Sequence, residues 1–274
     1  MIELKTDAQL IAMRAAGLVV AAGLDAMQNL ARPGVTTAEM DAAARQVLAE
    51  AGATSSFLGY GAEYGVGFPG VACISVNNEI VHGIPGERVL AEGDLVSCDF
   101  GAILEGWHGD AARSFIVGDG RPEHVKLVAD THEALWRGIA AARLGGRTGE
   151  ISAAIQGYVR QLRAGYGIVR EYTGHGIGSE MHMEPDIPNF GRRHHGVRVE
   201  RGMAMAIEPM ITLGTHQTSV LDDEWTVVTR DGSWGAHWEH TITVTPRGVW
   251  VLTAADGGEA ELARLGVPFG PLAD

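Results

Sequence analysis

The chain has 274 residues, of which 46% are hydrophobic and 20% charged, a composition that supports a sizeable core and argues against disorder. Its net charge of −13 argues against a nucleic-acid-binding protein, because contact with phosphates needs a basic face. An acidic chain instead suits a protein that attracts a cation or a substrate amine. Two cysteines, Cys73 and Cys98, form no C-x-x-C pair and predict a reducing compartment.

The N-terminal segment is predicted to be helical and is no signal peptide, because charged residues such as Lys5 and Arg14 interrupt it. Its longest nearly apolar run, residues 15–24, is too short to span a bilayer. We therefore expect a cytoplasmic protein without a membrane segment. Thr6 and Thr36 each have a Gln or Glu three residues later, the spacing of a capping box, and so mark the starts of two helices.

A second pair of helices is expected over residues 122–144 and 149–164, with strand-like runs before and after it. The order helices, strands, helices, strands predicts an α+β fold of two similar halves rather than alternating βαβ units. No linker divides the halves, so a single domain over residues 1–274 is expected. The expected strands are residues 71–76, 95–103, 114–117, 203–207, 225–228, 241–245 and 249–252.

The segment VSCDFGAILEGWHGDAARSF has the pattern of a β-hairpin that carries two aspartates. With Leu104 and Glu105 as the central turn residues, Asp99 faces Asp110 across the hairpin. Like charges directly opposite each other destabilise a sheet, by about 4 kcal/mol at about 4 Å and an effective dielectric of about 20. Some compensating interaction, such as a bound cation, must therefore offset the repulsion between the two aspartates. The alternative is a solvated loop in which both carboxylates face water.

Two glutamates lie in apolar, strand-like surroundings: Glu208 follows MAMAI, and Glu239 lies in AHWEHTITVT. Such a glutamate is buried only when it is paired or bound to a metal, and the alternative is an outward-facing strand position. The stretch GHGIGSEMHMEP places His175 among glycines and His182 seven residues later, which excludes the H-E-x-x-H helix of zinc proteases. It predicts an extended or looping segment whose backbone approaches a ligand closely.

Together, four carboxylates and one imidazole form a candidate set of five metal ligands: Asp99, Asp110, His175, Glu208 and Glu239. Two divalent cations would balance the four carboxylates, and a shared hydroxide would leave a charge that suits a positive substrate amine. Ions about 3.5–4 Å apart that share a hydroxide form a hydrolytic centre. Mixed carboxylate and imidazole ligands favour Mn, Fe, Co or Zn over Ca or Mg.

Five motifs occur in one order: NNEIVHGIP, the Asp99/Asp110 pair, GHGIG, AIEPM and WEHTITVT. In these motifs the chain resembles the type I methionine aminopeptidases of the short bacterial form, from about residue 4 to residue 253. The resemblance implies the pita-bread fold, with two pseudo-symmetric halves of antiparallel strands backed by helices, and removal of the initiator methionine from nascent proteins. The resemblance also implies that the five residues are ligands of two metal ions and that Glu208 is the general base as well. It implies that His82 and His182 are catalytic histidines that bind no metal.

The resemblance also implies an apolar pocket for methionine and a small second residue in the substrate. His82 and His182 would contact the substrate at one end, and sulfur–aromatic contacts would suit the thioether at the other. The chain departs from the family pattern in its longer glycine-rich loop, near residues 59–70, and in two aromatic replacements at positions 57 and 68. The candidate lining residues are Phe57, Tyr60, Phe68, Cys73, Met181 and Trp225.

Two other functions remain open: an X-Pro aminopeptidase or prolidase with the same ligands, and a catalytically inactive binding protein of this fold. The basic segment GRRHHGVRVERG is expected to be a solvated loop, with a transient ribosome contact as the alternative. Most of the other histidines, such as His108 and His216, are expected at the surface. We expect a monomer that acts on the N-terminal methionine of nascent polypeptides and binds no DNA.

Overall fold

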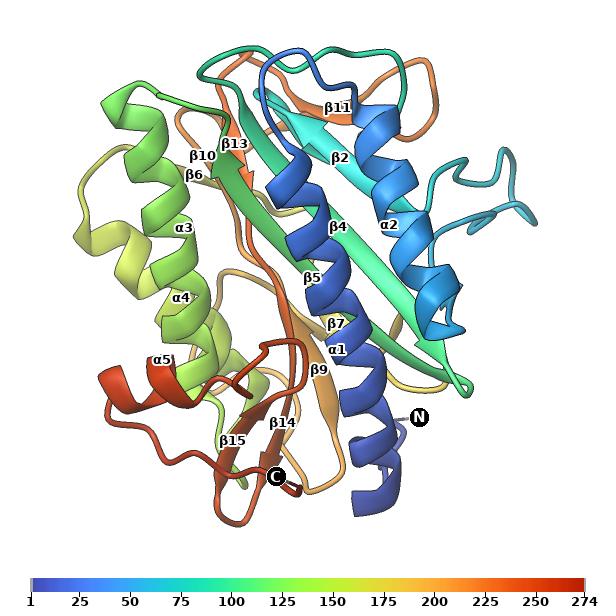
Figure 1. Ribbon diagram of the computed structural model, residues 1–274. Helices are drawn as coiled ribbons and strands as arrows, with labels where there is room; N and C mark the ends of the chain where they lie inside the picture. The colour runs from blue at the N-terminus through green and yellow to red at the C-terminus, as the bar shows by residue number, and fades with distance from the viewer. Residues whose placement is uncertain (1, 274) are drawn as a thin grey trace.

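The computed structural model describes residues 2–273, and its order of helices and strands confirms the predicted α+β class (Figure 1). Both predicted capping boxes are formed, with the hydroxyls of Thr6 and Thr36 accepting from the backbone N–H groups of Gln9 and Glu39. The helices are α1 (Asp7–Leu30), α2 (Thr37–Ala51), α3 (Pro122–Ala141), α4 (Thr148–Gln161) and α5 (Glu259–Arg264).

The strands pair antiparallel in four sheets within the described residues. One sheet, in the N-terminal half, contains β1 (Thr54–Ser55), β4 (Leu95–Leu104), β2 (Ala72–Val76) and β5 (Trp107–Ile116). A five-stranded sheet in the C-terminal half has the order β15 (Gly248–Val251), β14 (His240–Thr245), β9 (Ala204–Ile207), β7 (Gly174–Gly176) and β8 (Met183–Ile187). The two smaller sheets are β13 (Gly235–His237), β10 (Met210–Thr212) and β6 (Gly167–Ile168), and β11 (Thr218–Val220), β12 (Val227–Thr229) and β3 (Glu79–Val81).

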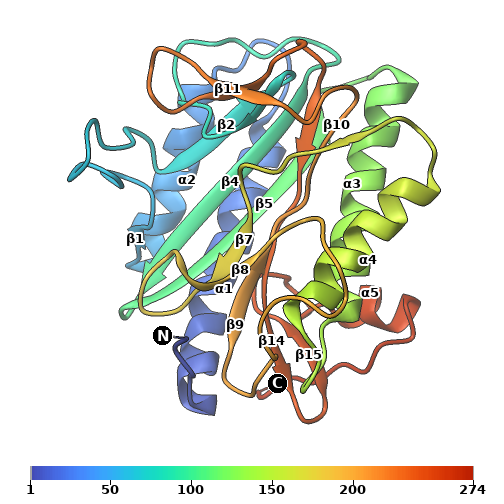
Figure 2. The same ribbon diagram turned by 180° about the vertical axis from the view of Figure 1, so that it is seen from behind.

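Each half packs a pair of helices against its strands. In the N-terminal half, apolar residues of α1 and α2 form one core with β2, β4 and β5. In the C-terminal half, α3 and α4 form another with β9, β14 and β15. From behind, α1 and α2 lie on the far side of β4 and β5, whereas β7 and β8 lie on the near side (Figure 2). The face of the N-terminal sheet that α1 and α2 do not cover therefore turns toward the C-terminal strands.

The β4–β5 hairpin differs in register from the sequence prediction. Leu104 pairs with Trp107, so the central turn residues are Glu105 and Gly106 rather than Leu104 and Glu105. Both turn residues have positive φ, 50° and 82°, as a two-residue turn of type I′ requires. The prediction that Asp99 directly faces Asp110 is therefore wrong.

In the observed register, Asp99 pairs with Ala112, and Asp110 pairs with Gly101. Paired residues share one face of a sheet, and so do residues two positions apart on a strand. The two aspartates are therefore diagonal neighbours on the same face, and the conclusion that they lie close together survives the change of register.

Helix α1 as a whole is long and apolar enough to cross a membrane by length and composition, although the apolar run 15–24 alone is not. Its apolar side chains are used inside the fold instead, with Leu10, Met13 and Met27 almost fully buried. The Arg14 guanidinium also donates hydrogen bonds to backbone carbonyls at residues 251–255. These contacts are typical of a core helix of a folded domain.

Candidate metal centre and active site

The N-terminal half contributes two carboxylates from one hairpin. Asp99 on β4 and Asp110 on β5 lie close enough to hydrogen-bond to each other. Burial raises the pKa of Asp110 to about 7, and burial together with the charge of Asp110 raises the pKa of Asp99 well above its ordinary value. Two carboxylates held together in this way bind either a proton or a cation.

The C-terminal half contributes three residues from separate segments. His175 lies on β7, where it pairs with Ala206 of β9, and Glu208 directly follows β9. Glu239 lies between β13 and β14 and exchanges backbone hydrogen bonds of 2.9 and 3.3 Å with Ala112 of β5. Since Ala112 is also the cross-strand partner of Asp99, this backbone contact joins the two halves at the carboxylates.

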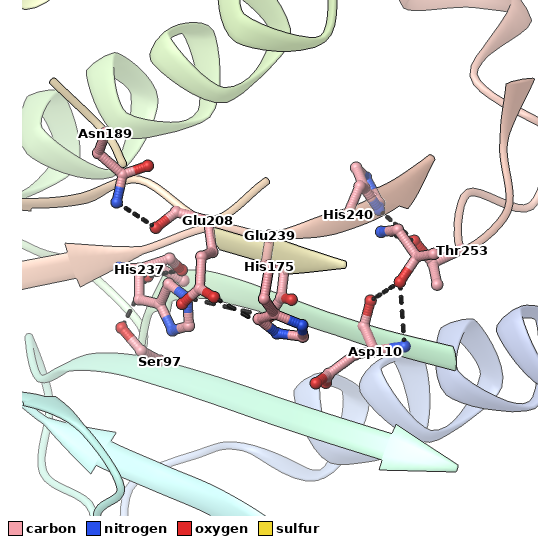
Figure 3. Close-up of polar contacts among 11 residues, drawn as sticks. Ser97, Asp110, His175, Asn189, Glu208, His237, Glu239, His240 and Thr253 are labelled. Carbon is pink, nitrogen blue, oxygen red and sulfur yellow. Dashed lines mark hydrogen bonds and ion pairs between the residues drawn. The ribbon is translucent and has the colours of Figure 1, made fainter. Parts of the chain in front are cut away.

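The side chains of these segments converge (Figure 3). One ligand atom each from Asp110, His175 and Glu239 lies within 4.8 Å of the others, and His175 Nε2 is 3.6 Å from Glu208 Oε1. His175 Nδ1 is 2.9 Å from the carbonyl oxygen of Gly176. Because a carbonyl only accepts, Nδ1 carries the proton and Nε2 keeps the lone pair that a metal needs.

The electrostatics of this cluster fit a divalent metal. Burial raises the pKa of both Glu208 and Glu239 well above the ordinary value, and burial lowers the pKa of His175 to about 3. Within residues 2–273, one buried oxygen each of Asp99, Asp110 and Glu239 has no hydrogen-bond partner. Orphaned carboxylate oxygens and a neutral imidazole around one point form the oxygen and nitrogen donor set of a transition-metal site.

His237 also belongs to this site, although it was not predicted from the sequence. It is 1% exposed, and burial lowers its pKa to about 3. The expectation that most of the other histidines lie at the surface is wrong: His124 is also buried, and His108 and His216 are half-buried. His237 lines the same pocket as the acidic residues. The period of an extended strand was the signal that could have found it, because His237 lies two residues before Glu239 and so on the same side. The neighbouring His240 turns away and bonds to Thr253 at 2.8 Å (Figure 3).

The two predicted catalytic histidines border the same pocket. His82 has φ 59°, a left-handed backbone conformation that is uncommon for residues other than glycine and clusters at functional sites. Its ring lies 5.4 Å from Tyr172 and 6.0 Å from Trp225, and burial lowers its pKa to about 4. His182 is exposed at the mouth of the pocket, with its ring 4.4 Å from that of His175.

A tyrosine from the glycine-rich loop holds His182. Tyr60 Oη is 2.7 Å from His182 Nδ1, and the two rings meet edge-on at 5.2 Å. Nε2 is therefore the nitrogen of His182 that remains for other contacts. Trp225 anchors the same glycine-rich loop, because its indole N–H donates a hydrogen bond to the carbonyl of Val66 at 2.8 Å.

The apolar residues predicted for a methionine pocket form the opposite wall. Phe57, Phe68, Cys73 and Met181 are buried in one cluster, against which Trp225 packs. Phe68 stands at its centre, edge-on to both Phe57 and Trp225 at 6.5 and 5.3 Å. All six predicted lining residues border the pocket that also contains the five predicted metal ligands.

Comparison with known proteins agrees with this arrangement. Residues 11–246 match metallopeptidase family M24. Methionine aminopeptidase 1 of Mycobacterium tuberculosis is 49% identical over 91% of this chain and 94% of its own length. The crystal structure of a methionine aminopeptidase from Thermotoga maritima superposes with a TM-score of 0.88 at 39% identity, covering 92% of this chain and 99% of the other.

More distant structures share the fold alone. The prolidase from Pyrococcus furiosus has a TM-score of 0.70 at 21% identity, and the match covers 92% of this chain but only 65% of the prolidase. The remaining third or so of the prolidase lies outside the match. The common part of these proteins is the pita-bread fold, which confirms the predicted architecture.

Proposed function

The chain belongs to metallopeptidase family M24, among its methionine aminopeptidases, and we propose that it removes the initiator methionine from nascent proteins that have a small second residue. One observation carries the proposal: a single pocket joins a buried cluster of carboxylates and imidazoles to an apolar aromatic wall. The charged end suits hydrolysis beside a free amine, and the apolar end suits an unbranched thioether side chain.

The charged end would hold two divalent ions, of Mn, Fe, Co or Zn. Its protein donors are the five predicted ligands: Asp99, Asp110, His175, Glu208 and Glu239. When bound, the ions supply Lewis acidity and an activated water at neutral pH. The carboxylates must lose their protons for this, and because burial raises the pKa of all four, metal binding would compete with protons at these groups.

Side chains of the protein would bind the substrate amine, transfer the proton and enclose the methionine side chain. Asp99 would attract the positive α-amine of the substrate and so fix the first peptide bond in the cleft. Glu208 would act as general base and pass the proton on to the leaving amine, as its raised pKa suits it to do. The aromatic wall around Phe68 would enclose the methionine side chain and exclude water.

The two histidines would act on the peptide bond itself. His182 would donate from Nε2 to the oxygen that becomes negative in the transition state, since Tyr60 occupies its Nδ1. His82, held between Tyr172 and Trp225, would hydrogen-bond the nitrogen of the scissile amide. Neither histidine is assigned to a metal.

Peptide hydrolysis tests the proposal. Met-Gly, Met-Ala and Met-Ser peptides should be cleaved, and Met-Lys and Met-Phe should not, as the proposed preference for a small second residue requires. The protein should contain metal when it is active. Equal rates on Leu-Ala peptides would contradict the methionine pocket, and full activity in a metal-free sample would contradict the hydrolytic mechanism.

An X-Pro peptidase is the second candidate, because prolidases share this fold. The chain is 49% identical to a methionine aminopeptidase but 21% identical to this prolidase, which favours the first proposal. Cleavage of Ala-Pro peptides at the rate of Met-Ala peptides would reverse the order.

We also propose that residues 1–274 act as one cytoplasmic catalytic domain and as a monomer; residues 1 and 274 lie outside the described part of the chain. A transient contact with the ribosome would bring it to nascent chains. The exposed residues 192–195, Arg-Arg-His-His, support such a contact in an otherwise acidic protein. Cosedimentation with ribosomes at low salt should weaken in the double variant Arg192→Glu, Arg193→Glu.

A further inference from the structure

His237 is a buried histidine that the proposed mechanism does not use. His237 is 1% exposed, yet neither its Nδ1 nor its Nε2 has a hydrogen-bond partner among residues 2–273. Burying a polar group without a partner costs free energy, and most buried ring nitrogens in proteins are therefore bonded. A histidine left in this state beside a cluster of carboxylates needs a ligand to explain it.

The ring is aimed at the metal centre. His237 Nε2 is 3.7 Å from Glu208 Oε2 and 4.0 Å from Glu239 Oε2, both too long for hydrogen bonds. On the other side of Glu208, His175 Nε2 is 3.6 Å from Oε1. Glu208 thus lies between two imidazoles at nearly equal distances, as the dashed lines show (Figure 3).

These separations are the ones expected of atoms that share an ion. Donors that each lie about 2.1 Å from one metal are about 3 to 4 Å apart, depending on the coordination angle. His237 therefore has the same relation to Glu208 as the predicted ligand His175.

The backbone holds His237 in place and leaves its ring free. The His237 N–H donates to Ser114 Oγ at 2.9 Å, and the Ser114 hydroxyl donates to the His237 carbonyl at 2.7 Å. The residue also pairs with Met210 in the β13–β10 ladder. A side chain on a fixed backbone, with an unused lone pair facing a donor cluster, is preorganised for ligation.

We propose that His237 Nε2 is a sixth protein donor to the metal centre, so that the centre has two imidazoles rather than one. The inference rests on the proposed metallopeptidase function. A second imidazole shifts the preference of the site toward Zn, Fe or Co and away from Mg. It also predicts that the metals are held more tightly than the five predicted ligands alone would hold them.

X-ray absorption spectroscopy on the zinc- and cobalt-loaded protein tests this directly. Multiple scattering from imidazole rings should correspond to two histidines per pair of ions in the unsubstituted protein. His237→Gln should lower this count to one. Zn²⁺ and Co²⁺ affinity, measured by calorimetry, should fall by about 10- to 100-fold or more. The matched control is His240→Gln, since His240 faces Thr253, and it should change neither the imidazole count nor the affinity.

A count of one imidazole in the unsubstituted protein, or an unchanged count in His237→Gln, would overturn the inference. The first of these outcomes needs no variant and so does not depend on whether His237→Gln folds. A protein that binds two ions and cleaves Met-Ala peptides with a single imidazole would refute the role of His237 alone. A protein that binds no metal would refute the proposed function as well.

Discussion

The two ends of the active-site pocket are stabilised in opposite ways. At the apolar end, Phe57, Phe68 and Met181 pack against one another and gain free energy simply by being buried. At the charged end, Asp110 and Glu239 are buried and Asp99 and Glu208 are partly buried beside them, and burial raises the pKa of each carboxyl. One end is therefore complete in the protein alone, whereas the other is stable only when protons or cations neutralise it.

The difference indicates which part of the pocket carries specificity and which carries chemistry. Changes at the apolar end should alter KM and substrate choice without touching metal content. Changes at the charged end should alter metal content, pH dependence and stability. Substitutions at the two ends can therefore separate the two functions experimentally.

Loss of a metal ligand should have the largest effect. His175→Ala and Glu239→Ala should lose more activity than the roughly 10²–10³-fold that removal of one oxyanion donor costs, because the metal itself is lost. Elemental analysis should show depleted metal, and excess metal should restore part of the activity. Chelation of the unsubstituted protein should likewise abolish activity and lower Tm, and Mn or Co should reverse both changes. Full metal content in both variants would remove the distinction between the two ends.

The pH dependence of stability comes next. Asp110 has a folded-state pKa of about 7, above its ordinary 3.8, so the folded protein keeps this proton as pH rises while the unfolded chain loses it. Metal-free protein should therefore lose stability as pH rises from about 4 to about 7, because the unfolded chain releases a proton that the Asp99/Asp110 pair retains in the folded state. Thermal unfolding across pH measures the effect. It should shrink in Asp110→Asn and in the presence of metal, and a flat profile for metal-free protein would contradict the electrostatic account.

Removal of a catalytic histidine should cost activity without costing metal. His182→Ala should lower kcat and kcat/KM together by about 10²–10³-fold, because the lost contact forms mainly in the transition state. His82→Ala should lose a similar amount or somewhat less. Steady-state kinetics and elemental analysis on the same samples decide the matter. A metal-depleted His182→Ala protein would make His182 a ligand.

Truncation of an aromatic side chain in the apolar wall should weaken substrate binding. Phe57 is 6% exposed, and Phe57→Ala removes its ring from the wall of the pocket. We expect KM for Met-Ala peptides to rise by about 10-fold, or about 1.4 kcal/mol, slightly less than the roughly 1.5–3 kcal/mol that full burial of a methionine side chain contributes. Bulkier N-terminal residues should become better substrates. A fall in metal content in this variant would show that the two ends are not independent.

The smallest effect is expected where the two ends meet. Tyr60→Phe keeps the ring in the pocket wall but removes the hydroxyl that contacts His182 Nδ1 at 2.7 Å. A single hydrogen bond is worth about 0.5–1.5 kcal/mol, so kcat should fall about 2- to 12-fold while KM hardly changes. A rise in KM at constant kcat would assign Tyr60 to binding alone.

The local sequence predicted the elements of the fold because its signals act over a few residues. The capping boxes at Thr6 and Thr36 fixed the starts of α1 and α2, since a cap depends on a residue three positions away. Strand boundaries were less accurate: residues 225–228 were expected to be extended, but β12 begins at Val227. The hairpin register was missed because two turns, one residue apart, fit the same sequence, and the left-handed conformations of Glu105 and Gly106 selected between them.

By itself, the sequence determined the α+β class, the acidic pair on one hairpin and the candidate set of five metal ligands, because composition, periodicity and short spacing carry that information. The resemblance to a known family supplied the apolar pocket and the roles of His82 and His182. Only the tertiary structure brought His175, Glu208 and Glu239 to that hairpin: β9 pairs with both β7 and β14, and the backbone contact between Glu239 and Ala112 joins these strands to β5. Only it revealed His237 with free ring nitrogens beside Glu208. Whether a buried group has a partner depends on chain segments that are far away in the sequence, such as Glu208 and Ser114 for His237, and no local pattern records them.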